Sequence, residues 1–338
     1  MSRVLDIVVT HYNEPWEVAR PFFDMLGAQR SVDFSKFKIW FIQDGPAPSV
    51  FPSGYFVGSP LGRSIDNFEI VTIQHKGVSA ARNTGLDRAD SEWICFCDCD
   101  DSFSSIYSLK MLFYILTPEQ PFDIMWNTFY MNRLDEDDSL ILQNEYNHVW
   151  IHNKYYRLSF LREHDIRFCE ELYMSEDSAF NNVAEMEVGE GRVGEIHTDF
   201  PLYAWVRRRG SITTDPERYY KNAEGHFERN KYVLGEYRKR KHDRASLVMA
   251  RTVTDAYSML TKFPENDESR RITERVGEFY RKERWCWKKL TPEMKRLALE
   301  ASEKEVATLG VDIPGKPSLS NWIRTRLARE PSQLKHGL

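Results

Sequence analysis

Three carboxylates end an alternating apolar run at residues 93–101, which has the sequence Trp-Ile-Cys-Phe-Cys-Asp-Cys-Asp-Asp. Alternation with period two predicts a strand, and open α/β sheets have their ligand sites at the carboxyl ends of strands. Asp98, Asp100 and Asp101 would repel one another there unless a cation lay among them. Because Mg²⁺ and Mn²⁺ favour carboxylate and phosphate oxygens, the run predicts a metal–diphosphate site. A solvated acidic turn is the alternative interpretation.

A second acidic pair, Glu176 and Asp177, stands at the start of a helical pattern. Ser175 has the side chain of a typical helix N-cap, and carboxylates near a helix N-terminus are stabilised by the helix dipole. Capping alone would explain the pair structurally.

The elements that must position these acids alternate between strands and helices. Strands are expected at 4–9, 37–42, 69–74, 91–101 and 123–130, and helices at 16–26 and after Ser79. Ser79 could cap its helix, and Gly85 lies near the expected end. The alternation predicts an α/β domain in which helices flank a mostly parallel, Rossmann-like sheet.

Polar residues follow the first two expected strands. Thr10, Tyr12, Asn13 and Glu14 form a polar loop that ends in a proline. Asp44 closes the second strand in a Gln-Asp-Gly-Pro turn. A carboxylate at this position could accept hydrogen bonds from a ribose or a base edge, or it could simply form the turn.

Four pieces of this sequence resemble, in order and spacing, the motifs of family 2 glycosyltransferases with the GT-A fold. They are Thr10-His11-Tyr12-Asn13-Glu14, Asp44-Gly45, the segment 77–85 (Gly-Val-Ser-Ala-Ala-Arg-Asn-Thr-Gly) and Asp98-Cys99-Asp100-Asp101. The resemblance implies a nucleoside diphosphate sugar as donor, with a UDP-sugar favoured. It implies that the Thr10 loop and Asp44 lie near the base and ribose, and that Arg82 and Asn83 lie close to the nucleotide.

The same resemblance assigns roles to the acids. Asp98 and Asp100 would form the DxD motif and hold Mn²⁺ or Mg²⁺, with Asp100 touching the metal. In the pair Glu176-Asp177, Asp177 matches the position of the family's catalytic base. Arg209, in a run of three arginines, could meet the diphosphate.

Three further residues are candidates for the acceptor side, namely Trp126, His152 and Lys154. The segment 150–157 resembles one that lines the acceptor side in related enzymes. His152 and Lys154 stand inside an aromatic run, so a half-buried polar pair packed by aromatic rings is the alternative.

The last third of the chain shows only helical patterns, and the resemblance does not extend into it. Helices are expected at 219–241, 245–263, 269–289 and 292–309. One apolar stripe in the second of them has helical spacing and is expected in the core: Leu247, Ala250, Val253, Thr254, Tyr257 and Leu260. The sequence therefore predicts a GT-A catalytic domain at 1–215 and a basic α-helical C-terminal domain at 216–338.

Charge is distributed unevenly between these two parts. Residues 1–215 carry 19 basic and 33 acidic side chains, and residues 216–338 carry 27 and 18. A basic half suggests an anionic partner, either DNA or a membrane surface that is contacted peripherally, and solvated helix faces are the alternative. No apolar stretch is long enough to span a bilayer, and no signal peptide is evident at the N-terminus.

The five cysteines favour a reducing compartment, and we expect a cytoplasmic protein. Cys95, Cys97 and Cys99 alternate along one expected strand, which predicts small side chains in the core and no disulfide framework.

Together these patterns predict a metal-dependent, hexosyltransferase-like enzyme that moves a sugar to a hydroxyl acceptor, a polysaccharide or another glycan. A single base opposite the leaving group implies direct displacement with inversion. Two alternatives remain at this point: transfer to a hydroxylated base of DNA, as in phage-type DNA modification, or a non-catalytic nucleotide-sugar binding protein.

Overall fold

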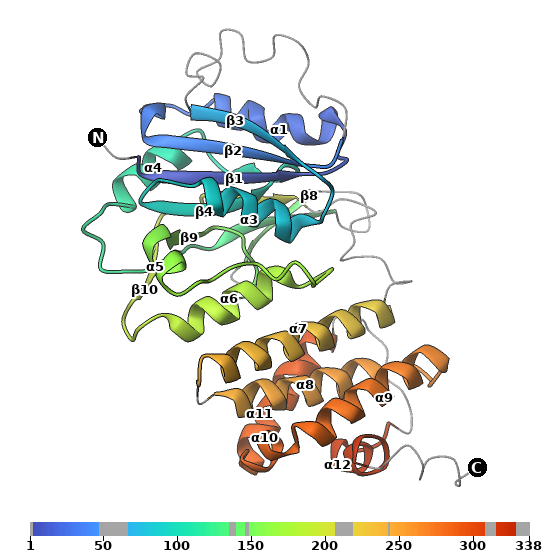
Figure 1. Ribbon diagram of the computed structural model, residues 1–338. Coiled ribbons are helices and arrows are strands. Elements are labelled where there is room, and N and C mark those ends of the chain that lie inside the picture. Colours follow the sequence, from blue (N-terminus) through green and yellow to red (C-terminus); the bar gives the residue numbers. More distant parts are fainter. Residues whose placement is uncertain are drawn as a thin grey trace. The chain divides into compact units, whose positions relative to one another are not determined.

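A computed structural model of the 338-residue chain shows two compact units (Figure 1). The structure describes residues 3–46, 67–134, 140–145, 149–206, 219–242, 244–307 and 316–328. One unit comprises Met1–Glu171 and Glu176–Ser211, and the other comprises Leu172–Ser175 and Ile212–Leu338. We call them the sheet unit and the helical unit, and each is described by itself.

A seven-stranded sheet with the order β10-β6-β9-β4-β1-β2-β3 forms the centre of the sheet unit. Its strands are β1 (Leu5–His11), β2 (Phe37–Asp44), β3 (Phe68–Ile73), β4 (Trp93–Asp98), β6 (Ile124–Trp126), β9 (Lys154–Arg157) and β10 (Val193–Glu195). Neighbouring strands run parallel except at β9, which is antiparallel to both β4 and β6. The prediction of a mostly parallel sheet flanked by helices is confirmed.

Helices cover both faces of this sheet (Figure 1). They are α1 (Trp16–Gly27), α3 (Val78–Arg88), α4 (Ser108–Ile115), α5 (Leu158–Glu163) and α6 (Glu176–Glu187). Because side chains alternate along a strand, Ile7 and Val9 of β1 join one hydrophobic core with α1 and α4, whereas Val8 faces Gly85 of α3. Burial on both faces explains the continuous apolar runs of the central strands.

The three alternating cysteines lie in this core, as the sequence predicts. Cys95, Cys97 and Cys99 are buried, with thiols that form no disulfide, and they pack in the same cluster as α1.

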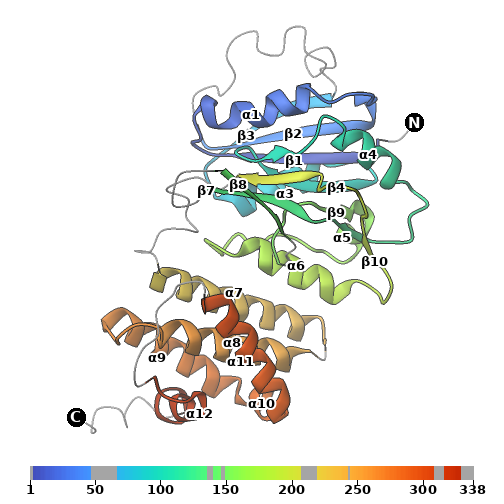
Figure 2. The ribbon, with the colours of Figure 1, turned by 180° about the vertical axis from the view of Figure 1, so that it is seen from behind.

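A second, four-stranded sheet packs against the same face as α1 and α4 (Figure 2). Its order is β5-β11-β7-β8, with β5 (Ser102–Phe103), β7 (Phe129–Leu134), β8 (Leu140–Glu145) and β11 (Tyr203–Val206). The single strand expected at 123–130 is therefore wrong, since β6 and β7 belong to different sheets. Asn127 follows β6: its backbone N–H donates to the Asn153 carbonyl oxygen, one pair beyond Trp126 and Lys154 in the β6–β9 register, and its side chain donates to Thr198.

Helix α3 starts at Gly77, not at Ser79. Gly77 is the N-cap residue with φ 94°, a left-handed conformation that glycine adopts without strain, and no side chain caps the helix. Ser79 is buried inside the first turn, so its predicted capping role is wrong. Loop geometry determined this start, because the Gly77 and Lys76 N–H groups both donate to Asp44.

The helical unit consists of helices only among its described residues. They are α7 (Tyr219–Lys239), α8 (Ala245–Leu260), α9 (Asp267–Lys282), α10 (Arg284–Lys288), α11 (Pro292–Ala307), α12 (Leu319–Trp322) and a π-helical turn at Ile323–Leu327. The single helix expected at 269–289 is two helices, with Glu283 between them. The predicted stripe of α8 is buried except for Leu247, which is 43% exposed.

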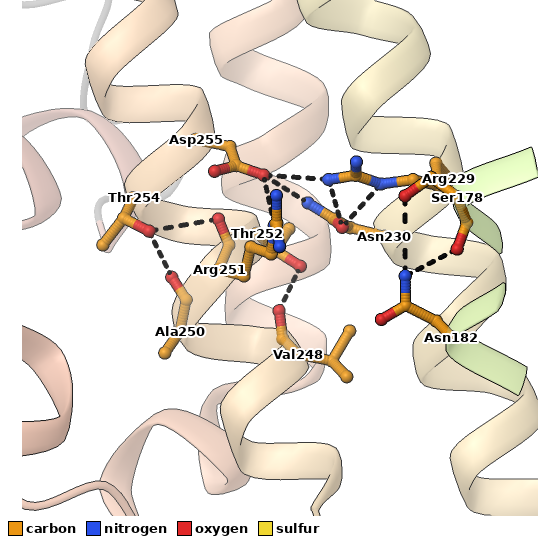
Figure 3. A network of polar contacts seen from close by, with 10 residues as sticks. All are labelled: Ser178, Asn182, Arg229, Asn230, Val248, Ala250, Arg251, Thr252, Thr254 and Asp255. Atoms are coloured by element: carbon orange, nitrogen blue, oxygen red, sulfur yellow. Dashed lines mark hydrogen bonds and ion pairs between the residues drawn. The ribbon is translucent and has the colours of Figure 1, made fainter. Parts of the chain in front are cut away.

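A buried polar network ties α7 to α8 (Figure 3). Arg229 Nη2 and Asn230 Nδ2 each donate to Asp255 Oδ2 at 3.0 Å. Arg251 lies 3.5 Å from the same oxygen. These cations lower the pKa of Asp255 although burial would raise it, so the carboxylate stays charged inside the unit.

No helix in the described part of the chain is both long enough and apolar enough to cross a membrane.

A substitution at Gly85 tests how closely α3 packs against β1. A Cβ atom at this position would overlap the side chain of Val8. We expect Gly85→Ala to lower the free energy of unfolding of the sheet unit by about 1–2 kcal/mol, because overpacking outweighs the gain in helix propensity. Urea denaturation measures this change.

Gly27→Ala is the matched control, since Gly27 ends α1 and no atom would lie within 4 Å of its Cβ. We expect it to leave stability unchanged or slightly higher. Equal stabilities for the two variants would contradict the close contact between α3 and β1.

Candidate active site

An acidic cluster lies at the carboxyl end of β4. Asp98 is the last residue of the strand and is paired with Thr10 of β1. One carboxylate oxygen from each of Asp98, Asp100 and Asp101 lies within 4.8 Å of the others. The three acids differ in burial and in hydrogen-bond partners, so they are suited to different roles.

Asp101 is the buried, supporting member of the cluster. Its Oδ2 accepts from the Tyr203 hydroxyl at 2.6 Å, and its Oδ1 accepts from the Val206 N–H at 3.0 Å. Burial and the nearby charges of Asp98 and Asp100 raise the pKa of Asp101 well above its usual value. This carboxyl group fastens β11 to the end of β4 and is poorly suited to bind a cation.

The two carboxylate oxygens of Asp98 differ in their hydrogen bonds. Its Oδ1 accepts from Thr10 Oγ1 at 2.9 Å and from Arg82 Nη2 at 3.1 Å. Burial alone would raise the pKa of Asp98, but the charge of Arg82 and the bond from Thr10 lower it, so the group is ionised. Oδ2 accepts no hydrogen bond from the described residues, and Asp100 is half-buried beside it.

Arg82 joins the acidic cluster to the first turn of α6. Its guanidinium donates through Nη2 to Asp98 and through Nη1 to Glu176 Oε1 at 2.8 Å, and it lies 5.3 Å from the centre of the Phe168 ring. The side chain is only 4% exposed. Burial opposes its charge, yet the negative charges of Asp98, Glu176 and Asp177 raise its pKa. One buried cation therefore holds together residues from β4 and α6.

Asp177 lies in the first turn of α6, next to Glu176. Burial, and then the negative charge of Glu176, raise the pKa of Asp177 to about 7, although Arg82 and Lys154 act in the opposite direction. Its Oδ1 accepts from the Ser178 N–H at 2.6 Å. Ser175 directly precedes the helix, as predicted for its N-cap residue, but with φ 58° in place of the extended backbone that is usual at that position. A carboxylate with a pKa near neutrality is well matched to general base work.

The predicted nucleotide loop is held in place by its own polar contacts. The Tyr12 N–H donates to Glu14 Oε2 at 2.9 Å, and Cys99 Sγ lies 3.6 Å from the same oxygen. Tyr12 is 43% exposed and its ring stacks on His75 with centroids 4.2 Å apart. Asn13 is exposed beside it. Glu14 thus anchors the loop, while Tyr12 presents an open aromatic face.

Asp44 and Asn83 are engaged by the protein itself. Asp44 accepts from the N–H groups of Lys76 and Gly77 and from His75 Nδ1, at 2.8–2.9 Å. The Asn83 side chain bonds the N–H and the carbonyl oxygen of Phe168, each at 2.9 Å. Both therefore position the segments on either side of Arg82, and their predicted contacts with a nucleotide stay predictions.

The acceptor-side candidates come together at β6 and β9. Trp126 and Lys154 are directly paired across these strands. Lys154 is buried and contacts the Trp150 carbonyl oxygen, and burial lowers its pKa to about 8. His152 is buried with its ring stacked on Tyr203 and Trp205, and burial lowers its pKa to about 4, so it is neutral. The aromatic packing predicted as the alternative is present for His152.

Two supporting residues were missed from the sequence. Tyr203 bonds Asp101 across 102 positions, and His75 combines a bond to Asp44 with stacking on Tyr12. No spacing rule connects such distant positions. Arg209 lies outside the described residues.

The geometry can now be compared with known proteins. Residues 6–171 match the family model described as glycosyl transferase family 2. This part of the chain belongs to this family. It is a glycosyltransferase, as the resemblance implied. A search of curated proteins finds no match for this glycosyltransferase.

Among solved structures, the glycosyltransferase is similar to TarS of S. aureus. The crystal structure of TarS 1–349 has a TM-score of 0.62 at 16% identity, covering 89% of this chain and 88% of that one. TarS 1–349 in complex with UDP-GlcNAc has a TM-score of 0.62 at 15% identity, with the same coverage. The crystal structure of TarS has a TM-score of 0.61, and the match covers 93% of this chain and 59% of that one. At this identity the likeness shows the fold.

Replacing Arg82 tests whether its bonds to Asp98 and Glu176 stabilise the protein. We expect Arg82→Gln to lower the free energy of unfolding by about 3 kcal/mol at pH 7, because it leaves two carboxylates without their buried cation. The pKa of Asp98 is lowered in the native protein, so this stabilisation is present above its unfolded pKa and is lost as pH falls. The deficit of the variant should therefore shrink in acid, which denaturation at several pH values measures.

Arg88→Gln is the control in the same helix. Arg88 is exposed and lies 3.9 Å from Glu69, so its loss should change stability by less than about 0.5 kcal/mol. A deficit for Arg82→Gln that equals this control, or that does not depend on pH, would show that the bridge adds no stability.

Proposed function

We propose that this glycosyltransferase is a metal-dependent, inverting enzyme that moves a sugar from a nucleoside diphosphate sugar, preferably a UDP-sugar, to the hydroxyl group of a glycan acceptor. One observation carries the proposal: the buried Arg82 guanidinium bonds both Asp98 and Glu176. The candidate metal ligand and the neighbour of the candidate base thus share one guanidinium, so both functions lie within one small site.

The chemistry of the acids fits a hard divalent cation. Asp98 is ionised and keeps Oδ2 clear of hydrogen bonds from the described residues, and Asp100 is near it. These two carboxylates would hold Mn²⁺ or Mg²⁺, whereas Asp101 is engaged by Tyr203 and Val206. Such a cation supplies charge neutralisation at a leaving diphosphate.

Asp177 is the proposed base. In its ionised form it would accept the proton of the acceptor hydroxyl as that oxygen attacks the anomeric carbon of the donor sugar. The sugar–phosphate bond breaks on the opposite side, so one displacement inverts the configuration. Glu176 is held by Arg82 and raises the pKa of its neighbour, which supports a proton-accepting role near neutral pH.

A uridine donor and a glycan acceptor complete the proposal. Solved complexes of TarS contain UDP and UDP-GlcNAc, and this fold likeness supports uridine donors as the first to test. Tyr12, with its open ring stacked on His75, is the proposed platform for the base. Trp126, His152 and Lys154 are proposed to border the acceptor, and Arg209 to meet the diphosphate.

The basic C-terminal region gives no observation that favours DNA. Arg238 lies 2.7 Å from Glu283, and Lys239 and Arg240 lie 3.7 and 3.0 Å from Glu236. These three cations at the end of α7 are paired with acids of the same unit. A glycan acceptor is therefore proposed ahead of DNA. We also propose peripheral membrane contact, a cytoplasmic location and a domain boundary at residue 215.

A donor panel tests the substrate and the metal together. We expect one UDP-sugar to raise the melting temperature of the protein only when Mn²⁺ or Mg²⁺ is present, and to be hydrolysed slowly. Asp100→Ala should lose both effects, because the carboxylate that holds the cation is gone. Stabilisation that is equal with and without the metal, or equal in Asp100→Ala, would refute metal-dependent donor binding at this site.

Asp177→Asn tests the base. We expect kcat to fall by about 10²–10⁴-fold with donor affinity unchanged, because only proton transfer is removed. In the native enzyme, kcat should rise with pH through about 7 and then level, since Asp177 is active when ionised. The groups that set this limb are Glu176 on α6, Arg82 on α3 and Lys154 on β9. A variant with native kcat, or a native rate that is flat from pH 5 to 9, would remove Asp177 from this role.

A further inference from the structure

The short helix α10 has one face in the core of the helical unit and one face in solvent. Cys286 and Trp287 are buried, and the Trp287 ring lies between neighbouring helices, 6.1 Å from the Tyr280 ring of α9 and 4.8 Å from the Lys295 ammonium of α11. The opposite face carries exposed side chains, which we call the α10 surface: Arg284, Trp285, Lys288 and the adjoining Lys289. Because residues four apart are neighbours on a helix, these side chains lie together.

The cations of the α10 surface have no acidic partners among the described residues. This holds for three cations of the surface and for one at the end of α9: Arg284, Lys288, Lys289 and Lys282. The only acid in the stretch 281–289, Glu283, is buried and accepts from Arg238 at 2.7 Å. By contrast, the exposed Arg270 and Arg296 of the same unit each pair with two acids. Positive charge that is not neutralised locally therefore gathers around α10.

Trp285 adds an apolar group to the middle of these charges. Its side chain is 43% exposed, although its indole N–H donates inward to Glu283 at 3.0 Å. The part of the ring that faces solvent is therefore carbon. The Lys289 ammonium lies over the same ring, 4.8 Å from its centre. Tryptophan is enriched where a protein meets a membrane–water interface, and lysine and arginine beside it reach the headgroups with their charged ends.

We propose that the α10 surface docks on an anionic lipid membrane. Its cations would meet lipid phosphates, and the Trp285 ring would enter the interfacial layer between them. Charge complementarity also fits nucleic acid, but a base-stacking platform needs an open aromatic face, and Lys289 lies over the Trp285 ring. The proposal gives a surface to the membrane contact proposed above, and it depends on neither the metal site nor the base.

Vesicle sedimentation with the full-length protein tests the partner. We expect binding to vesicles of phosphatidylcholine mixed with phosphatidylglycerol, and little binding to vesicles of phosphatidylcholine alone. Binding should weaken as salt is added, because exposed charges are screened. No binding to the anionic vesicles at low salt, or equal binding to both kinds of vesicle, would overturn the proposal.

Two double variants with the same change in net charge test the surface. Lys288→Gln with Lys289→Gln should lower binding to the anionic vesicles about 10-fold or more, because each cation near such a membrane contributes about fivefold. Arg270→Gln with Arg296→Gln is the control, since these exposed cations are already paired, and it should lower binding less than about 2-fold. Equal losses would show that net charge, and not the α10 surface, is responsible.

Trp285→Ala tests the contribution of the ring. We expect binding to the anionic vesicles to fall about 10-fold, because the apolar group that enters the interface is removed while every cation stays. Native vesicle binding by this variant, with an unchanged melting temperature, would contradict the proposed insertion. A duplex DNA oligonucleotide is measured alongside. Tighter binding to DNA than to the vesicles, lost in Lys288→Gln with Lys289→Gln, would overturn the membrane as the partner.

Donor hydrolysis separates this proposal from the proposed reaction. Without vesicles, the variant with Lys288→Gln and Lys289→Gln should hydrolyse the donor at the native rate, since neither residue belongs to the candidate active site. Asp100→Ala should bind the anionic vesicles as the native protein does. A loss of vesicle binding in Asp100→Ala equal to that in the double variant would overturn the α10 surface as the docking site.

Discussion

The organisation of the site depends on one buried cation. A guanidinium removed from water costs several kcal/mol unless charged partners surround it. Arg82 obtains these partners from two elements that are distant in the chain, Asp98 at the end of β4 and Glu176 at the start of α6. The requirement to neutralise Arg82 therefore sets the distance between the acidic cluster and α6. The same contact therefore both stabilises the sheet unit and fixes the spacing of the candidate site residues.

Two further polar residues support that contact, Asp44 at the end of β2 and Asn83 next to Arg82 in α3. Asp44 holds the loop that leads into α3 by accepting the N–H groups of Lys76 and Gly77. Asn83 bonds the backbone of Phe168, whose ring lies under the guanidinium. Asp44 and Asn83, which the family motifs connect with a nucleotide, thus also position Arg82. Each side chain can bind a ligand as well only if it has hydrogen-bonding capacity left over from these protein contacts.

The sequence was sufficient for the parts of the fold that follow local rules. Alternation and helical spacing gave the strands and helices of the Rossmann-like sheet, and the ordered motifs indicated Asp98, Asp100 and Asp177 before any geometry was known. The sequence could not predict hydrogen bonds between residues that are far apart in the chain. Arg82 and Glu176 are 94 positions apart, and Tyr203 and Asp101 are 102 apart, so composition and spacing carry no record of which acid each partner serves.

One error in capping and one in strand assignment have a common cause. Ser79 has the side chain of an N-cap, but backbone conformation decides the role, and Gly77 with its positive φ is the N-cap of α3. Likewise, the run at 123–130 has the composition of one strand, yet β6 pairs with β9 and β10 in the large sheet while β7 pairs with β8 and β11 in the small one. Local propensity was overridden where distant residues supplied hydrogen bonds.

The antiparallel strand β9 has a consequence for the order in which the protein assembles during synthesis. Strand β6 precedes β9 in the chain, but it is joined to the rest of the large sheet only through β9. When a ribosome has released β1 to β4, these four strands can already pair, and the outer edge of β4 stays open. It is closed only after Lys154–Arg157 emerges. An unpaired edge invites association with other chains, so this interval is when the nascent sheet is most exposed to aggregation or to capture by a chaperone.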